Sequence, residues 1–164
     1  MRNSKEQNRY EYEKYKLKKI ADYQFGEGVG DIIFPDEIEI EKSKKTGKIR
    51  NIKWNGKIIA TIRARDGWIS LTIHGADMIR RNVKPPKMRV IVVNDVKEII
   101  KRGRNVFAKH IKDADPEIRP GSEVIIVDEN DELLAVGKAI LNGEEMILFK
   151  RGIAVKVRKG VNEN

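Results

Sequence analysis

The chain has no cysteine and only two histidines among its 164 residues. The absence of cysteine excludes disulfides, iron–sulfur clusters and thiolate zinc sites, and it is typical of proteins from a reducing interior. Because His74 and His110 are the only histidines, a histidine-rich metal site is not expected either. We therefore expect a protein without a metal or a cofactor.

Long apolar runs are also missing. No segment approaches the roughly 20 residues that a membrane-spanning helix needs. The N-terminal sequence MRNSKEQNRYEY lacks the apolar centre of a signal peptide. These two absences predict a cytoplasmic protein with no membrane partner, and they leave its oligomeric state open.

Charge, in contrast, is plentiful. Asp, Glu, Lys and Arg make up 36% of the chain, and the net charge is +9. A composition rich in Lys, Glu, Arg, Ile and Val is typical of thermophiles. The positive excess favours polyanionic partners such as RNA, DNA or an acidic membrane surface. It is concentrated in residues 1–19 and 149–164, each of which carries a net charge of +4.

The first half of the chain predicts a basic helix and a small α+β domain. Residues 5–20 have the pattern of a charged surface helix, and we assign 1–19 to a basic N-terminal extension. The segment GEGVGD (26–31) lacks the Lys-Ser/Thr of a phosphate-binding loop, so we predict a flexible turn there. Strands are predicted at 38–43, 48–54, 57–64 and 68–71, and a helix at 72–82. Two turns of the type I′ kind are predicted at Asn55-Gly56 and Asp66-Gly67.

Two prolines within 83–87 mark a domain boundary, which gives a first domain at 20–84 and a second at 88–160. The second domain begins with a strand at 88–93. A helix is predicted at 95–102, with a capping box from Asp95 to Glu98 and a stop at Gly103. The remaining elements are extended segments at 105–111, 122–128, 132–141 and 153–159, with a capped turn at 142–145. This order predicts a small twisted sheet that closes into a pseudobarrel.

Four of these motifs, in this order, resemble the PUA domain, an RNA-binding fold. They are the Gly103 turn, PGSEVIIVD, AVGKA and RGIAVKV. The segments 22–40, 47–67 and 74–79 resemble the small domain that precedes the PUA domain in archaeal archaeosine tRNA-guanine transglycosylases. The resemblance implies an α+β fold, with a small mixed α/β domain followed by a PUA-like β pseudobarrel. The family's catalytic barrel and zinc-binding cysteines have no counterpart here, so we expect no enzyme and no catalytic residue.

The segment Gly103–Lys109 combines the groups that bind unpaired RNA. Gly103 lets the chain turn close to a ligand, and Arg104 can pair with a phosphate or stack on a base. Asn105 can hydrogen-bond a base edge, and Lys109 adds positive charge. Phe107 is either a stacking platform or a core residue, and the sequence does not decide between them. The resemblance implies that this region forms one wall of a pocket for the single-stranded 3′ end of a tRNA.

We expect the opposite wall in FKRGIAVKV (149–157). Lys150 and Arg151 are candidates for phosphate contacts, and Gly152 and Ala154 are small enough to admit a nucleotide. Strict alternation puts Ala154, Lys156 and Arg158 on one strand face, with Ile153, Val155 and Val157 on the other. Lys156 either contacts RNA or belongs to an ordinary soluble face.

The sequence therefore predicts a non-catalytic protein that binds RNA, with tRNA as the first choice, in connection with tRNA modification. Three alternatives stay open. The protein is an accessory subunit of a separate tRNA-modifying enzyme, a basic protein associated with the ribosome, or an enzyme of unrecognised activity. The lack of clustered titratable residues argues against the last of these.

Overall fold

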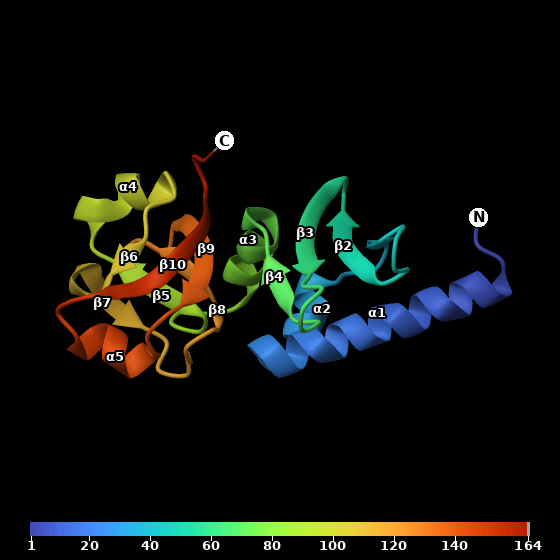
Figure 1. Ribbon diagram of the computed structural model, residues 1–164, viewed down its shortest axis with the longest axis horizontal. Helices are drawn as coiled ribbons and strands as arrows, with labels where there is room; N and C mark the ends of the chain where they lie inside the picture. Colours follow the sequence, from blue (N-terminus) through green and yellow to red (C-terminus); the bar gives the residue numbers. More distant parts are fainter. Residues whose placement is uncertain (164) are drawn as a thin grey trace. The chain divides into compact units, whose positions relative to one another are not determined.

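The computed structural model describes residues 1–163, which divide into two compact units, Met1–Ile79 and the chain from Arg80 onward (Figure 1). Each unit has its own β-sheet, of four strands in unit 1 and of six in unit 2. None of the described helices is long and apolar enough to cross a membrane.

Unit 1 begins with the long helix α1 (Ser4–Phe25), which extends beyond the predicted 5–20. The helix starts at a capping box, where the Asn3 side chain accepts a hydrogen bond from the Glu6 N–H at 2.9 Å. Only a narrow stripe of α1 is buried, consisting of Tyr10, Leu17, Ala21 and Phe25. The helix therefore presents most of its circumference to solvent, as its sequence predicts.

The segment after α1 differs from the predicted flexible turn. Gly26 and Gly28 do turn the chain with positive φ, but Val29–Ile33 forms a short helix, α2. A Cβ atom on Gly30 would lie 2.3 Å from the Lys18 carbonyl oxygen, so only glycine permits this approach to α1. The Asp22 carboxylate accepts a hydrogen bond from the Gly30 N–H at 2.7 Å. The glycines thus build a close helix–helix contact.

The sheet of unit 1 is an antiparallel meander in chain order, followed by the predicted helix α3 (Ile73–Asn82). The first hairpin turn is of type I′ because Asn55 and Gly56 both have positive φ. The second loop is wider than predicted, since within it only Gly67 has positive φ and the Arg63 backbone N–H donates to the Trp68 carbonyl oxygen at 2.9 Å. The strands are β1 (Glu39–Lys42), β2 (Ile49–Trp54), β3 (Lys57–Ile62) and β4 (Ile69–Leu71).

Unit 2 is built on a bent, nearly closed sheet in the order β6-β10-β9-β8-β5-β7. Neighbouring strands are antiparallel, except that β5 and β8 are parallel. Helix α4 (Lys97–Lys101) packs on β9 and β10, whereas α5 (Gly143–Leu148) packs on β7 (Figure 1). The strands are β5 (Arg89–Val92), β6 (Val106–Phe107), β7 (Ile111–Ala114), β8 (Glu123–Val127), β9 (Leu133–Ala139) and β10 (Ile153–Gly160). The predicted class, a small mixed α/β domain and then a PUA-like β pseudobarrel, is confirmed.

Two local predictions in unit 2 are wrong. The segment predicted as extended at 105–111 is interrupted by a 3₁₀ turn, η2 (Ala108–His110), where the Ala108 N–H donates to the Gly152 carbonyl at 3.0 Å. The capping box from Asp95 does not form, because the neighbouring Asn94 exchanges hydrogen bonds with Glu129 instead. The predicted cap at Asn142 is present, and it starts α5.

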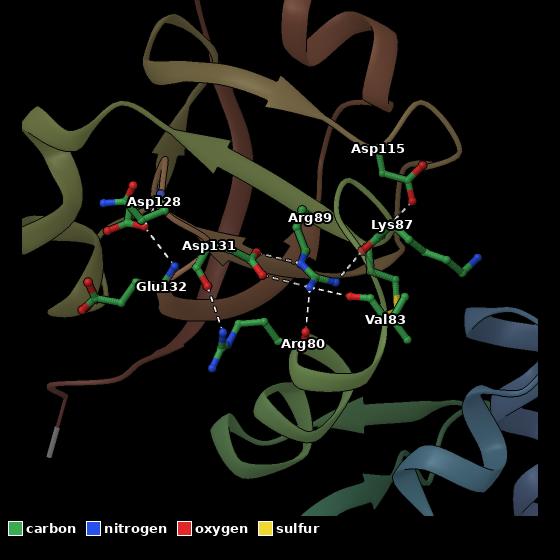
Figure 2. A network of polar contacts seen from close by, with 10 residues as sticks. Arg80, Val83, Lys87, Arg89, Asp115, Asp128, Asp131 and Glu132 are labelled. Carbon is green, nitrogen blue, oxygen red and sulfur yellow. Dashed lines mark hydrogen bonds and ion pairs between the residues drawn. The ribbon is translucent and has the colours of Figure 1, made fainter.

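A buried arginine that the sequence patterns did not single out holds the start of unit 2. Arg89 lies on β5, has no exposed surface and pairs with Asp131, with 3.0 Å between Nε and the carboxylate (Figure 2). Its other nitrogens donate to three carbonyl oxygens, those of Lys87, Arg80 and Val83, at 2.7–2.9 Å. Each guanidinium nitrogen is thus hydrogen-bonded, which is the condition under which a buried charge is tolerated.

Candidate nucleic-acid interface

Five of the predicted RNA-binding residues meet in one groove of unit 2, with a volume of about 690 Å³. The groove lies where the end of α4 meets β6 and η2. Ile99 and His110 complete its lining, although the sequence patterns did not select them as binding residues. The five predicted residues are Gly103, Arg104, Asn105, Phe107 and Lys109.

Gly103 shapes one end of the groove. Its φ of 100° ends α4, and its N–H donates to the Ile100 carbonyl at 2.9 Å. A Cβ atom at this position would lie 2.7 Å from the carboxylate of Glu163, which accepts a hydrogen bond from the Gly160 N–H. The backbone conformation therefore favours glycine here, whereas the flexible end of the Glu163 side chain could move away from a Cβ atom.

Asn105 joins the groove to the sheet. Its Oδ1 accepts a hydrogen bond from the Val157 N–H at 3.0 Å, close to the point where the pairing of β10 with β9 shifts register. The amide oxygen is thus used inside the fold. The amide NH₂ has no partner among residues 1–163, so it is the part of Asn105 that can reach a ligand.

Phe107 lies on the open side of the groove. Its neighbours Val106 and Ala108 are the buried residues of this segment, whereas Phe107 is 43% exposed. Its ring makes an edge-to-face contact with His110, with 6.5 Å between centroids. The core interpretation of Phe107 is therefore wrong, and its ring is available for stacking.

The second predicted wall lies next to the groove without lining it. Lys150, Arg151 and Gly152 are exposed in the connection from α5 to β10. The Gly152 carbonyl accepts the hydrogen bond from Ala108, and Ile153 is the cross-strand partner of Phe107. The structure therefore places this connection beside β6, at the rim of the groove.

The predicted alternation fails at the start of β10. The pairing of β10 with β6 shifts register between Ile153 and Val155, which turns Ile153 outward and both Ala154 and Val155 into the core. Ala154 has no exposed surface, so its side chain cannot admit a nucleotide. Lys156 is exposed farther along β10, where it faces Lys138 of β9 across the sheet.

The cations of the predicted site share one electrostatic property. Within residues 1–163, none of them forms an ion pair with a carboxylate, and the set comprises Arg104, Lys109, Lys150, Arg151 and Lys156. Some other cations of unit 2 are paired with carboxylates. Arg158 is bonded to the buried Glu123, and the hydrogen bond from Lys112 holds the pKa of Glu129 below its ordinary value. The groove and its rim therefore keep an uncompensated positive charge.

The sequence patterns did not single out a further feature, the exposed apolar side chains at the C-terminal end of α5. Ile147, Leu148 and Phe149 are 49%, 72% and 45% exposed. The signal in the sequence is the run MILF after the Asn142 cap. In such a short helix only Met146 faces the core. These side chains directly precede Lys150 and Arg151.

No metal chemistry is indicated by the part of the chain that the structure describes. Within it, no three His, Asp or Glu side chains are positioned to hold a metal ion.

Comparisons with known proteins agree with this architecture. Residues 15–86 match the patch-forming domain C2 of tRNA-guanine transglycosylase, and residues 88–161 match the PUA domain. The tRNA-guanine(15) transglycosylases of Thermococcus kodakarensis and Pyrococcus furiosus are each 51% identical to this chain over 144 residues, or 88% of its length. The chain spans only 24% of the length of these relatives.

Two solved structures share the fold of the whole chain. A hypothetical protein of the hyperthermophilic archaeon Pyrococcus horikoshii has a TM-score of 0.75 at 24% identity, covering 93% of this chain and 92% of its own. A conserved PUA domain protein of Thermoplasma acidophilum has a TM-score of 0.66 at 18% identity, covering 94% and 91%. The chain thus consists of a C2-type domain and a PUA domain, and it is similar to the C-terminal part of archaeal tRNA-guanine(15) transglycosylases, which are much longer.

Proposed function

We propose that this protein is a non-catalytic RNA-binding protein that holds the single-stranded acceptor end of a tRNA in the groove of unit 2. The observation that carries the proposal is the convergence of Arg104, Phe107 and Lys109 in one groove whose cations have no carboxylate partner. Cations without a protein partner bind phosphates most strongly, because no ion pair has to be broken first.

The groove offers each kind of contact that an unpaired RNA end requires. Arg104 and Lys109 supply charge for phosphates, and the exposed ring of Phe107 supplies a stacking surface. The NH₂ group of Asn105 can donate to a base edge. Lys150 and Arg151 extend the positive charge along the rim, where the preceding or following phosphates would lie.

The tRNA ligand is inferred from the relatives. Their names state that they act on tRNA, and the matched part contains the PUA domain and not the whole enzyme. A role in tRNA modification, in the cytoplasm, is the corresponding proposal for this chain. We propose no reaction, because no three His, Asp or Glu side chains of residues 1–163 are positioned to hold a metal ion and the chain matches only 24% of the length of these enzymes.

One observation favours a second candidate, an accessory subunit that delivers tRNA to a separate modifying enzyme. The adjacent Ile147, Leu148 and Phe149 side chains are exposed, and exposed apolar groups of this kind mark contact surfaces. This candidate keeps the RNA groove and adds a protein contact. Co-purification that depends on Leu148 would support it, and retention of the partner by Leu148→Ser would count against it.

The deciding experiment compares a tRNA transcript with the same transcript lacking its single-stranded 3′ end. Binding is measured at two salt concentrations for the wild type, Arg104→Ala, Lys109→Ala and the exposed control Lys44→Ala. We expect truncation to weaken wild-type binding, and each groove variant to lose about 1–3 kcal/mol on the intact tRNA alone. Equal binding of both transcripts by the wild type would contradict the acceptor-end proposal.

A further inference from the structure

Helix α1 of unit 1 carries a second set of cationic and aromatic side chains. At 100° per residue, they lie on the side of the helix opposite its buried stripe. We call this set the tyrosine–lysine face. It consists of Lys5, Tyr12, Tyr15, Lys16, Lys19 and Tyr23, all exposed. It includes no acidic residue and no aliphatic one.

The aromatic rings of this face are exposed to an unusual degree. Tyr12, Tyr15 and Tyr23 are 62%, 58% and 82% exposed, whereas Tyr10 on the opposite side is buried. The Lys16 and Lys19 ammonium groups lie 5.5 and 5.3 Å from the ring centroids of Tyr12 and Tyr15, one helical turn earlier. Rings and charges therefore alternate along the helix within reach of one ligand.

Four other charged residues of α1 form ion pairs within unit 1, whereas Arg9 forms none among the described residues. Lys14 bonds Asp36 and Glu11, and although burial lowers the pKa of Lys14, these carboxylates raise it above its ordinary value. Lys18 pairs with Asp31. On the acidic side, Glu13 pairs with Lys42.

The lysines of the tyrosine–lysine face differ from these. Within residues 1–163, Lys5, Lys16 and Lys19 form no ion pair, and the capping box at the start of α1 uses Glu6. The carboxylates of Glu11 and Glu13 are paired with Lys14 and Lys42, and the tyrosine–lysine face itself carries only positive charge. A surface of this kind complements a polyanion.

We propose that the tyrosine–lysine face binds an unpaired segment of RNA, separately from the groove in unit 2. Lys16 and Lys19 would contact phosphates while Tyr12 and Tyr15 stack on bases, a combination that tolerates any base sequence. From Tyr12 to Tyr23 the face extends over about 16 Å of helix, so it can serve more than one nucleotide. The proposal rests on the proposed RNA-binding function for its choice of ligand, but on different residues.

An acidic membrane surface is the rival occupant that the charge would also fit. Helices that lie in a membrane interface insert Trp, Phe or Leu side chains into the lipid. None of the six residues of the tyrosine–lysine face is Trp, Phe or Leu, although the Tyr23 ring stacks on Trp68 of unit 1, with 5.6 Å between centroids. Its composition therefore favours RNA.

The experiment compares two charge-reversed variants of equal net charge. K16E/K19E changes the face, and K44E/K45E changes two exposed lysines in the loop from β1 to β2. Binding of a tRNA transcript and of an unstructured oligouridine is measured at two salt concentrations. We expect K16E/K19E to weaken both by about tenfold or more and to reduce the salt dependence, and K44E/K45E to change binding less than about twofold. Equal losses in the two variants would overturn the proposal.

A tyrosine variant separates stacking from charge. Y12A/Y15A should weaken oligouridine binding by about tenfold with the salt dependence unchanged, because no cation is removed. Alanine favours helix, so circular dichroism should show α1 intact. Unchanged binding by Y12A/Y15A would exclude stacking and overturn the proposal as stated.

The same measurements keep this proposal distinct from that of the groove. If K16E/K19E loses affinity for the tRNA lacking its 3′ end, while Arg104→Ala binds the intact tRNA like the wild type, the face binds RNA and the groove proposal fails. The reverse result rejects the face alone. Vesicles of phosphatidylserine and phosphatidylcholine test the rival occupant, an acidic membrane surface. If K16E/K19E abolishes vesicle binding and leaves the affinity for RNA unchanged, the proposal is overturned.

Discussion

Arg89 and Arg104 belong to the same unit and are only fifteen positions apart, yet the fold treats them in opposite ways. Arg89 is fully buried, is paired with Asp131 and is bonded to three carbonyls. Arg104 is exposed in the groove, and its side chain has no ion pair among the described residues. The buried arginine stabilises the unit through its partners, whereas the exposed one keeps its donors available for a ligand.

The same division separates other cations of the molecule. Arg158, predicted to share the face of Lys156, is bonded to the buried Glu123, while Lys156 has no such partner. In unit 1 the same contrast holds between Lys14, which is paired, and Lys16, which is not. In these two pairs of cations, the one with a carboxylate partner is held within the fold and the one without a carboxylate partner remains available to a ligand.

The largest expected effect is on stability, at Arg89. Arg89→Met should lower the free energy of unfolding of unit 2 by about 3–5 kcal/mol, because it leaves Asp131 and three carbonyls without their donor. Denaturant unfolding followed by circular dichroism measures it. The matched control is Arg104→Met, for which we expect a change within about 0.5 kcal/mol. Similar losses for both variants would remove the contrast between the two arginines.

The next effect is on binding, at the rim of the groove. Arg151→Ala should weaken tRNA binding by about 1–3 kcal/mol with unfolding unchanged, because Arg151 has no partner within residues 1–163. Fluorescence anisotropy with a labelled transcript measures the loss. Normal binding by Arg151→Ala, together with weak binding by Arg104→Ala, would confine the site to the groove.

A smaller effect concerns the helix that precedes this rim. Asn142→Ala removes the cap of α5, where the Asn142 side chain accepts from the Glu145 N–H at 2.8 Å, and should destabilise unit 2 by about 1 kcal/mol. Thermal unfolding measures the change, with Asn142→Ser as the conservative control. A concurrent loss of tRNA affinity would show that α5 positions Lys150 and Arg151.

The smallest expected effect is a pH dependence at a buried acid. Burial raises the pKa of Asp128, but N–H donors of Glu132 and Asn130 outweigh it, with help from Lys97. The pKa of Asp128 in the folded state therefore lies below its ordinary value of 3.8. A carboxyl group with a depressed pKa stabilises the fold above that value, and the contribution is lost as pH falls through the folded pKa.

Asp128→Asn tests this linkage. The hydrogen bonds from Asn130 and Glu132 reach the carboxylate at 2.9 Å, so the variant should be less stable than the wild type near neutral pH. The difference should shrink below about pH 4, as the wild-type acid becomes protonated. Urea unfolding at a series of pH values measures it, and a constant difference would contradict the assignment.

Regular elements were predictable from sequence where local chemistry determines them. Asn55-Gly56 specifies its hairpin, and the Asn142 cap specifies α5. The grouping of five groove residues was predictable because they lie within seven consecutive positions of the chain, 103–109. Local chemistry alone could not reveal the bulge that buries Ala154, because it depends on how β6 pairs with β10. Local chemistry also could not reveal that the Asn94 side chain accepts a hydrogen bond from the distant Glu129 N–H instead of capping a helix.

The Arg89 network was hidden for a related reason. A charged residue within the apolar strand MRVIVV is a visible signal, but its partner Asp131 lies 42 positions away in a turn. The turn itself was predicted from Asn130-Asp131, and Asp131 does adopt positive φ. Two of the three carbonyls that complete the network, those of Val83 and Lys87, come from the segment predicted as a domain boundary, and the third, that of Arg80, lies in α3. The arginine in the apolar strand and the Asn130-Asp131 turn were each visible in the sequence, but only the fold shows that Arg89 and Asp131 pair.

The position of β10 has a consequence for the order in which unit 2 can fold. This strand is the last of the unit in chain order, yet it inserts between β6 and β9, so both keep an open edge until it arrives. The two-residue strand β6 has no other partner in the sheet. During synthesis, therefore, the groove wall at Phe107 can form only after some fifty further residues have been made. A nascent chain would complete this wall of the candidate groove only after β10 is made, and until then it would expose open strand edges, which promote aggregation.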